Sequence, residues 1–293
     1  MPKVFDAAVD GLWKQIYNPV TRRLFEMIPR KLVAPFNPGL RRLVALVDEG
    51  LSSVKAYRST EMKGDGPVIF DCLRHLSDEL AGMEAVAFLI AGSDTSALTL
   101  GSTVWHMCHD PSIKRKLTAA LKEAFPEHRA GEYPALPELE SVPYLVACVK
   151  EGLRVAMPVS GRLPRVVPGA GSVAPLVVDD IVVPPGTVVG ISAYTMHNSE
   201  ELWGSNARSF QPERWLGEDA KGLDEYLVTF SKGARNCIGQ TLARADIIVV
   251  LYMLFRNFDI ELDAASEKGI FTSDNFTKKM LEPGLMLKMR PIT

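Results

Sequence analysis

The longest helical pattern in the chain runs from about Ser77 to Cys108 and stops before Asp110-Pro111. Apolar side chains occur on nearly all sides of this segment, which is typical of a central helix buried in a globular fold. Its middle, Ala91-Gly92-Ser93-Asp94-Thr95-Ser96, interrupts that pattern with a glycine and an acid. Glycine weakens a helix by roughly 1 kcal/mol relative to alanine, and an aspartate is rarely buried without a partner. Such departures from local rules cluster at functional sites, so this stretch is a candidate site.

Shorter patterns predict the remaining elements. Apolar residues at helical spacing indicate helices at 40–59, 112–125, 144–155 and 240–256. Ser112 is the expected N-cap of the second of these, and a further helical stripe in 1–30 is broken at Asn18-Pro19. Short β-branched runs indicate strands at 176–178, 181–183, 188–191, 259–262 and 284–289. Asp179-Asp180 suits a turn, whereas 263–280 has the composition of a loop. The prediction is a fold that is mainly α with a small β-sheet, in a single domain over 1–293.

Size, charge and cysteine usage narrow the class of protein. The 293 residues can bury a sizeable core in one or two domains. A formal net charge of −2 argues against a general nucleic-acid binder. The four cysteines lack the paired spacing of a disulfide framework or a zinc site, which favours an intracellular, reducing setting. The longest clean apolar run, Ile247 to Phe255, is far short of the roughly 20 residues of a membrane span.

A glycine-flanked loop near the C-terminal end holds one cysteine just before a predicted helix. The stretch is Phe230-Ser231-Lys232-Gly233-Ala234-Arg235-Asn236-Cys237-Ile238-Gly239, and the helix over 240–256 follows at once. Backbone N–H groups and the positive end of a helix dipole stabilise a thiolate, which is the form of cysteine that ligates metal. The glycines let the loop lie close to a flat ligand. The alternative for this cysteine is a small buried hydrophobe.

This loop resembles the haem-binding loop of the cytochromes P-450, Phe-x-x-Gly-x-Arg-x-Cys-x-Gly, at every fixed position. The resemblance implies that Cys237 is the proximal thiolate ligand of the iron of haem b. A thiolate in that position pushes electron density onto the iron and favours O–O cleavage. The resemblance also implies that Arg235 binds a haem propionate, and that Phe230, Gly233 and Gly239 lie against the cofactor.

The polar middle of the long helix resembles the oxygen-activation motif of the same family, Ala/Gly-Gly-x-Asp/Glu-Thr-Thr/Ser, at all positions. The resemblance implies that Thr95 orients dioxygen and its water and that Asp94 relays protons. It places Ala91 and Gly92 on the distal side of the haem. The alternative is a polar kink without chemistry, because glycine and serine pairs commonly kink helices.

Two further motifs carry charged residues with an expected structural role. Glu151 and Arg154 share a helix face at i, i+3, and a surface ion pair is the alternative for any single pair of this kind. Their apolar neighbours make burial plausible, and a buried pair needs further partners. The stretch Gln211-Pro212-Glu213-Arg214-Trp215 resembles the Pro-Glu-Arg-Phe motif of the family, with Trp215 in place of the usual phenylalanine. The resemblance implies a triad of Glu151, Arg154 and Arg214 that holds the cysteine loop in place.

The segment Gly161-Arg162-Leu163-Pro164-Arg165 corresponds to the part of the family's fold that runs past the haem. The resemblance implies that Arg165, with Arg162 as the alternative, binds a haem propionate. Arginine suits carboxylates because its fork makes bidentate, charge-assisted bonds. His197 lies where the family often has a structural or propionate-contacting histidine, and no catalytic role is assigned to it.

Together the motifs imply a haem-thiolate monooxygenase of a eukaryotic, fungal type. It would insert one oxygen atom of O₂ into a small lipophilic substrate, in secondary metabolism. Electrons would come from NADPH through a separate NADPH-cytochrome P-450 reductase, because the chain shows no convincing dinucleotide motif. The alternatives are a catalytically inactive, truncated pseudoenzyme of the same family and a binding module that shares the helical scaffold. Haem incorporation separates the first alternative from the enzyme.

The resemblance covers the chain from about the third predicted helix to the end. Residues 1–60 show no match to the membrane anchor, the first helices or the main sheet strands of the family. Trp13, for example, is not followed by the arginine that the family's propionate-binding helix requires. The expectation is therefore the C-terminal part of the cytochrome P-450 fold, incomplete at its N-terminus. Full-length relatives usually lie at the endoplasmic reticulum membrane, and an intracellular location without a membrane anchor is expected for this chain.

Overall fold

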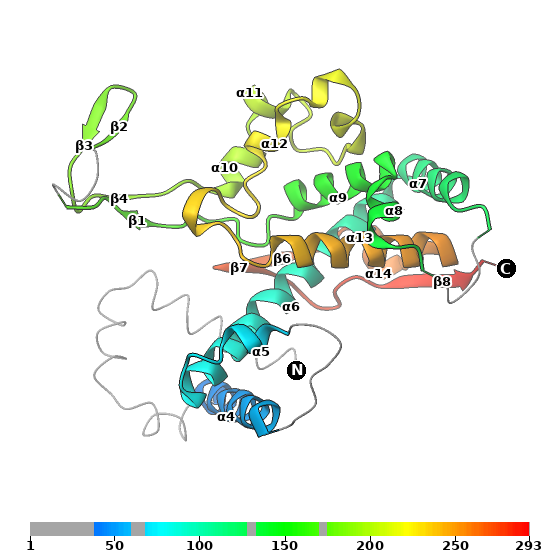
Figure 1. Cartoon of the computed structure of the whole chain (residues 1–293). Helices are drawn as coiled ribbons and strands as arrows, with labels where there is room; N and C mark the ends of the chain where they lie inside the picture. The colour runs from blue at the N-terminus through cyan, green and yellow to red at the C-terminus, as the bar shows by residue number, and fades with distance from the viewer. Residues whose placement is uncertain (1–37, 60–67, 128–132, 170–174, 293) are drawn as a thin grey trace. The chain divides into compact units, whose positions relative to one another are not determined.

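The computed structural model describes residues 38–59, 68–127, 133–169 and 175–292 (Figure 1). The helical stripe predicted within 1–30 lies outside these residues. The structure consists of two compact units, Met1–Thr95 with Asn275–Thr277, and Ser96–Asp274 with Lys278–Thr293. The prediction of a single domain over 1–293 stays a prediction.

The described part of the first unit contains α4 (Pro38–Ser59), α5 (Ile69–Cys72) and the first part of α6 (Asp78–His109). Two of these helices, α4 and α6, approach each other closely. A Cβ at Gly50 would lie 2.8 Å from the carbonyl oxygen of Gly82, and one at Gly82 would lie 2.9 Å from Leu51 Cα. The backbones of α4 and α6 therefore touch where both helices lack a side chain. A small apolar cluster lies beside this crossing, centred on Val54, Leu73 and Ala81.

The second unit holds the main hydrophobic core. Helix α13 (Gln240–Asn257) packs against α7 (Pro111–Ala124), α8 (Leu136–Glu140), α9 (Pro143–Ala156) and strand β5 (Phe258–Leu262). Fully buried side chains from these elements meet in the core, among them Leu117, Leu121, Leu145, Leu251 and Phe255. Short helical pieces connect β4 to the cysteine loop and to α13: α10 (Ala193–His197), α11 (Glu200–Trp203), η2 (Pro212–Trp215), η3 (Glu218–Ala220), α12 (Leu223–Tyr226) and η4 (Gly233–Arg235).

One helix boundary differs from its prediction. The N-cap of α7 is Asp110, not Ser112: the backbone of Asp110 is extended, and its carboxylate accepts a hydrogen bond from Ser112 N at 2.8 Å. Pro111 occupies the start of the helix, where its fixed φ fits and its missing N–H costs nothing. The proline therefore belongs to the helix, and the cap lies before it.

Within the described residues, the strands form four two-stranded sheets. Strand β1 (Arg165–Val166) pairs with β4 (Val188–Val189), and β2 (Leu176–Val178) pairs with β3 (Ile181–Val183), both antiparallel. Strand β5 pairs antiparallel with β8 (Leu287–Pro291), and β6 (Thr272–Asn275) neighbours β7 (Thr277–Met280). The mainly helical fold with a small β component is thus confirmed. The loop predicted at 263–280 is wrong, because this range contains α14 (Ala264–Glu267), β6 and β7.

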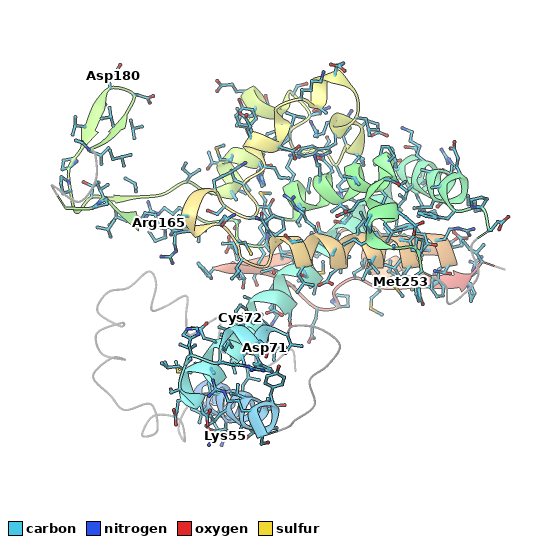
Figure 2. The ribbon with its side chains drawn as sticks, in the orientation of Figure 1. Lys55, Asp71, Cys72, Arg165, Asp180 and Met253 are labelled. Carbon is cyan, nitrogen blue, oxygen red and sulfur yellow. The ribbon has the colours of Figure 1, made fainter. Side chains whose placement is uncertain are left out.

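The predicted turn between β2 and β3 is confirmed. Asp179 and Asp180 have φ values of 49° and 64°, in the left-handed region that a tight two-residue hairpin requires. Aspartate tolerates this region better than most residues because of its short polar side chain. Asp180 lies at the tip of the hairpin (Figure 2).

The long helix is present at its predicted place, but its predicted burial on all sides is wrong. Its C-terminal part buries Val104 and Met107, whereas Leu80 and Met83 in its N-terminal part are 53% and 47% exposed. An apolar sequence pattern predicts which side chains favour burial, but it does not say what surface covers them. Among the described residues, α6 alone is long and apolar enough to cross a membrane by length and composition, a test that core helices of soluble proteins also pass.

Candidate functional site

The cysteine loop is a compact turn that presents its thiol outward. Cys237 lies between η4 and α13, and its backbone N–H donates to the carbonyl oxygen of Phe230 at 2.8 Å. Inside this closure, Asn236 N donates to Gly233 O at 3.1 Å. Gly233 has φ +75°, a conformation that side chains disfavour, so the turn depends on this glycine. The thiol of Cys237 is free and exposed.

Helix α13 begins directly behind the thiol. Its N-cap, Gly239, offers no side chain to the free backbone N–H groups of the first turn. Two apolar side chains next to Cys237 are strongly exposed, Ile238 at 86% and Leu242 at 66%. The guanidinium of Arg244 lies 5.2 Å from the ring centroid of half-buried Phe230.

These features fit a flat, apolar cofactor whose metal takes one sulfur ligand. A Cβ at Gly233 would meet nothing within 4 Å, and one at Gly239 would meet only the Cys237 sulfur, at 3.9 Å. Among the residues that the structure describes, no group of three or more His, Cys, Asp or Glu side chains could hold a metal ion. A lone thiol before a helix N-terminus, beside exposed apolar side chains, is therefore suited to haem iron, whose other ligands come from the macrocycle. Arg235 is also exposed and could meet an anionic group of the cofactor.

The structure brings Glu151, Arg154 and Arg214 together in the interior. Arg154 Nε lies 2.9 Å from Glu151 Oε2, and Arg154 Nη2 lies 2.8 Å from Glu151 Oε1. Arg214 Nε approaches the same Oε1 at 3.0 Å. The side chains of Glu151 and Arg154 are 0% and 1% exposed, so this is a buried pair and not a surface one. Their structural role for the cysteine loop remains an expectation, although the contacts place all three in one network.

Backbone groups and one indole N–H complete this network. Oxygen Oε1 of Glu151 also accepts the N–H of Gln211 at 2.8 Å, and Oε2 accepts the indole N–H of Trp215 at 2.9 Å. The remaining guanidinium N–H groups of Arg154 donate to the carbonyl oxygens of His197, Ala207 and Ser209 at 2.7, 2.6 and 2.8 Å. Desolvation of a buried pair is offset only when such further bonds satisfy it.

Sequence reasoning missed two members of the network. Trp215, which stands in place of the family's phenylalanine, supplies an indole N–H donor that phenylalanine lacks. His197 received no definite function, but it is fully buried and bonded through both ring nitrogens. A buried polar residue must find partners, and that rule was the one available signal for both.

The predicted oxygen-activation residues belong to the first unit, and the cysteine loop belongs to the second. Thr95 is half-buried, and its hydroxyl donates to the carbonyl oxygen of Ala91, one turn earlier, at 2.8 Å. Such back-bonding bends helices slightly. Asp94 is half-buried, and a Cβ at Gly92 would meet nothing within 4 Å, so the helix surface is open there.

The two arginines considered for a propionate are both exposed. Arg165 begins β1 (Figure 2), and its Nη1 donates to the carbonyl oxygen of Pro164 at 2.9 Å. Arg162 forms an isolated antiparallel bridge with Ser192. The structure gives neither arginine a carboxylate partner among the described residues, so the choice between them stays a prediction.

Comparison with known proteins agrees with these motifs. The sequence pattern that defines Cytochrome P450 matches residues 59–289. The cytochrome P450 monooxygenase penB of Penicillium thymicola is 33% identical, over 92% of this chain and 61% of that protein. The inactive cytochrome P450 monooxygenase cloA of Claviceps fusiformis is 36% identical, over 96% of this chain and 56% of that protein. The fusicoccadiene C-8 hydroxylase of Alternaria brassicicola is 32% identical, over 80% of this chain and 45% of that protein.

A solved structure supports the fold. A crystal structure of a cytochrome P450 superposes with a TM-score of 0.72 at 22% sequence identity, covering 86% of this chain and 57% of that chain. The chain spans about 61% of the length of penB and less of the other relatives named above. The family pattern and the fungal relatives cover most of the chain, so this protein belongs to the cytochrome P450 family.

Proposed function

We propose that this chain is the haem-binding part of a haem-thiolate monooxygenase. One observation carries the proposal: an exposed thiol, Cys237, closes a glycine turn at the N-terminus of α13. When bound, haem b supplies the activation of O₂ and the insertion of one oxygen atom into substrate. The protein's task is to ligate, orient and supply protons.

Each residue at the cysteine loop has a distinct part in this proposal. Cys237 gives its sulfur to the iron as a thiolate, the form of cysteine that ligates metal. Gly233 and Gly239 keep the loop free of side chains where the cofactor would lie, and Phe230 walls one side. Arg235 and Arg165 bind the propionate carboxylates, because each is an exposed guanidinium.

Oxygen activation is assigned to the stretch of α6 around Gly92, where the helix surface is open. Thr95 can offer its hydroxyl to dioxygen and water when it leaves its bond to Ala91 O. Asp94, its neighbour, passes protons from solvent to that hydroxyl. Ala91 and Gly92 leave this surface of the helix small, which provides room for dioxygen and substrate.

The partners follow from the same chemistry. The substrate is a small lipophilic molecule, of the kind that fungal secondary metabolism supplies, and it is hydroxylated or epoxidised. Electrons come from NADPH through a separate NADPH-cytochrome P-450 reductase. The network of Glu151, Arg154 and Arg214 supports the loop structurally. We place the protein inside the cell.

The test is the difference spectrum of the reduced, carbon-monoxide-bound chain. A strongly red-shifted Soret band means that a thiolate ligates the iron, and Cys237→Ala should abolish it. Cys72→Ala is the matched control, because Cys72 is also a free, exposed thiol. Loss of the band in the control as well, or its survival in Cys237→Ala, contradicts the assignment.

A second function is favoured by one observation. The relative cloA of Claviceps fusiformis, which is 36% identical, is named inactive. On this alternative the chain is a pseudoenzyme that keeps the fold without turnover. Haem incorporation separates the two: a folded chain that takes up no haem supports the pseudoenzyme, whereas the red-shifted Soret band supports the enzyme.

A further inference from the structure

His197 is a fully buried imidazole whose two ring nitrogens bond to different segments of the second unit. Its Nδ1 lies 2.9 Å from the carbonyl oxygen of Arg154 in α9. Its Nε2 lies 3.0 Å from the backbone nitrogen of Val228, in the segment that leads into the cysteine loop. A carbonyl only accepts and an amide N–H only donates, so both bonds require one ring state. That state is the neutral imidazole with its proton on Nδ1.

The segment that begins at Val228 supports the cysteine turn. The carbonyl oxygen of Val228 accepts the N–H of Ser231 at 2.9 Å. The hydroxyl of Thr229 donates to the carbonyl oxygen of Leu153 at 2.8 Å, which is a second link to α9. The carbonyl oxygen of Phe230 accepts the N–H of Cys237 at 2.8 Å. The carbonyl oxygen that holds Cys237 therefore belongs to Phe230, two residues after Val228, whose N–H bonds to His197.

We infer that His197 is a positioning residue whose Nδ1–H form offers Nε2 as the acceptor that fixes Val228, at the entry to the cysteine loop. It acts through the backbone N–H of Val228 and forms no hydrogen bond with the Cys237 thiol. The backbone of His197 is itself tied to α9 in any variant, because its carbonyl oxygen accepts an N–H of Arg154 Nη1 at 2.7 Å. The imidazole thus joins the buried Glu151 and Arg154 pair to the loop.

The surroundings of the ring favour this neutral form. Glu151 and Arg154 face it from α9, and Lys278 faces it from β7, where its Nζ lies 3.3 Å from the carbonyl oxygen of Ala156. The ring of Trp203 stands edge-on, with centroids 6.2 Å apart. Burial lowers the pKa of His197 to about 4, so the ring carries no charge near neutral pH. Protonation would place a donor at Nε2 against the N–H of Val228.

Two substitutions separate the two bonds. His197→Gln is long enough to put an amide oxygen near the place of Nε2, so it keeps an acceptor for Val228 N–H. His197→Asn reaches only the place of Nδ1, so it keeps the donor to Arg154 and leaves Val228 N–H unpaired. Amide hydrogen exchange of the full 293-residue chain at neutral pH is the readout. We expect exchange at Val228 and through 229–237 to be about tenfold faster in the asparagine variant and little changed in the glutamine variant.

Equal acceleration in both variants, or in neither, overturns the inference, because a merely space-filling histidine would not distinguish them. Should neither variant fold, nitrogen chemical shifts of the imidazole in the unmodified chain decide, and a proton found on Nε2 refutes it. A third readout rests on the proposed function: the asparagine variant should show a smaller share of the red-shifted Soret band than the glutamine variant. If the unmodified chain binds no haem, the proposed function fails, while exchange and ring tautomer still decide the role of His197.

Discussion

Replacing Glu151 by glutamine tests how much the buried network stabilises the second unit. The change keeps the shape of the side chain and removes its charge. Oxygen Oε1 accepts three bonds, from Arg154, Arg214 and Gln211, and Oε2 accepts two, from Arg154 and Trp215. The least disruptive orientation of a glutamine puts its NH₂ group at Oε2, where it faces two other donors.

The structure sets the magnitude. Two buried bonds are lost with their donors left unpaired, at about 1–3 kcal/mol each, which sums to about 2–6 kcal/mol. Breaking one partner of a buried ion pair typically costs about 3–5 kcal/mol, because the remaining charge is uncompensated. Arg154 would be that charge, with a side chain that is 1% exposed. A loss of this size is a large part of a typical unfolding free energy of about 5–15 kcal/mol.

Glu213→Gln is the matched control, because Glu213 is a glutamate of the adjoining motif whose partners lie nearer the surface. It pairs with Lys116 at 2.6 Å, and their side chains are 34% and 54% exposed. Pairs of this kind contribute about 0–1 kcal/mol. Urea unfolding followed by tryptophan fluorescence measures both variants, since Trp203 and Trp215 are buried in this unit. A midpoint for Glu151→Gln equal to that of Glu213→Gln would refute the reasoning.

Two further predictions concern packing and pH. Gly152→Ala should destabilise the chain by about 1–3 kcal/mol, because its Cβ would overlap the buried hydroxyl of Thr103. Gly92→Ala is the matched control and should stabilise the chain by about 1 kcal/mol, since nothing lies within 4 Å of that Cβ in helix α6. Urea midpoints of the two variants that equal each other would contradict this pair of predictions. Burial lowers the pKa of His106 and of His197 from 6.5 to about 4, so the unfolded chain binds protons first as the pH falls. Stability is therefore full above pH 6.5 and falls toward pH 4, by up to about 3 kcal/mol per histidine; a flat urea midpoint between pH 7 and 4.5 contradicts this.

The helices were predictable because their signals are local. Periodic apolar positions placed α9 and α13 within a residue or two of their observed ends. The turn at Asp179-Asp180 was predictable for the same reason, since two residues decide it. The cap of α7 was misplaced by two residues because proline was read as lying before the helix rather than in its first turn.

What escaped prediction depends on residues that are distant in sequence. The carbonyl oxygens that surround Arg154 come from positions 43, 53 and 55 residues away, and no periodicity predicts them. A resemblance to a family motif placed Glu151 and Arg154 with Arg214, but it did not show that Trp215 donates to the same carboxylate. The exposure of α6 escaped for a related reason: apolar composition predicts a preference for burial and not the covering surface.

The cysteine loop has few hydrogen bonds of its own, so we expect its order to depend on the segments on either side of it. Within the loop, two backbone bonds close the turn, those of Asn236 and Cys237, and glycine raises the entropy that ordering must overcome. Its stiffness has to come from α13 behind it and from the segment at 228–230, which is bonded to α9 through His197 and Thr229. Variants of Glu151 and variants of His197 should therefore have different effects on the second unit. Loss of Glu151 should lower the unfolding free energy of the whole unit, whereas loss of the Val228 bond should chiefly speed local exchange around the thiol.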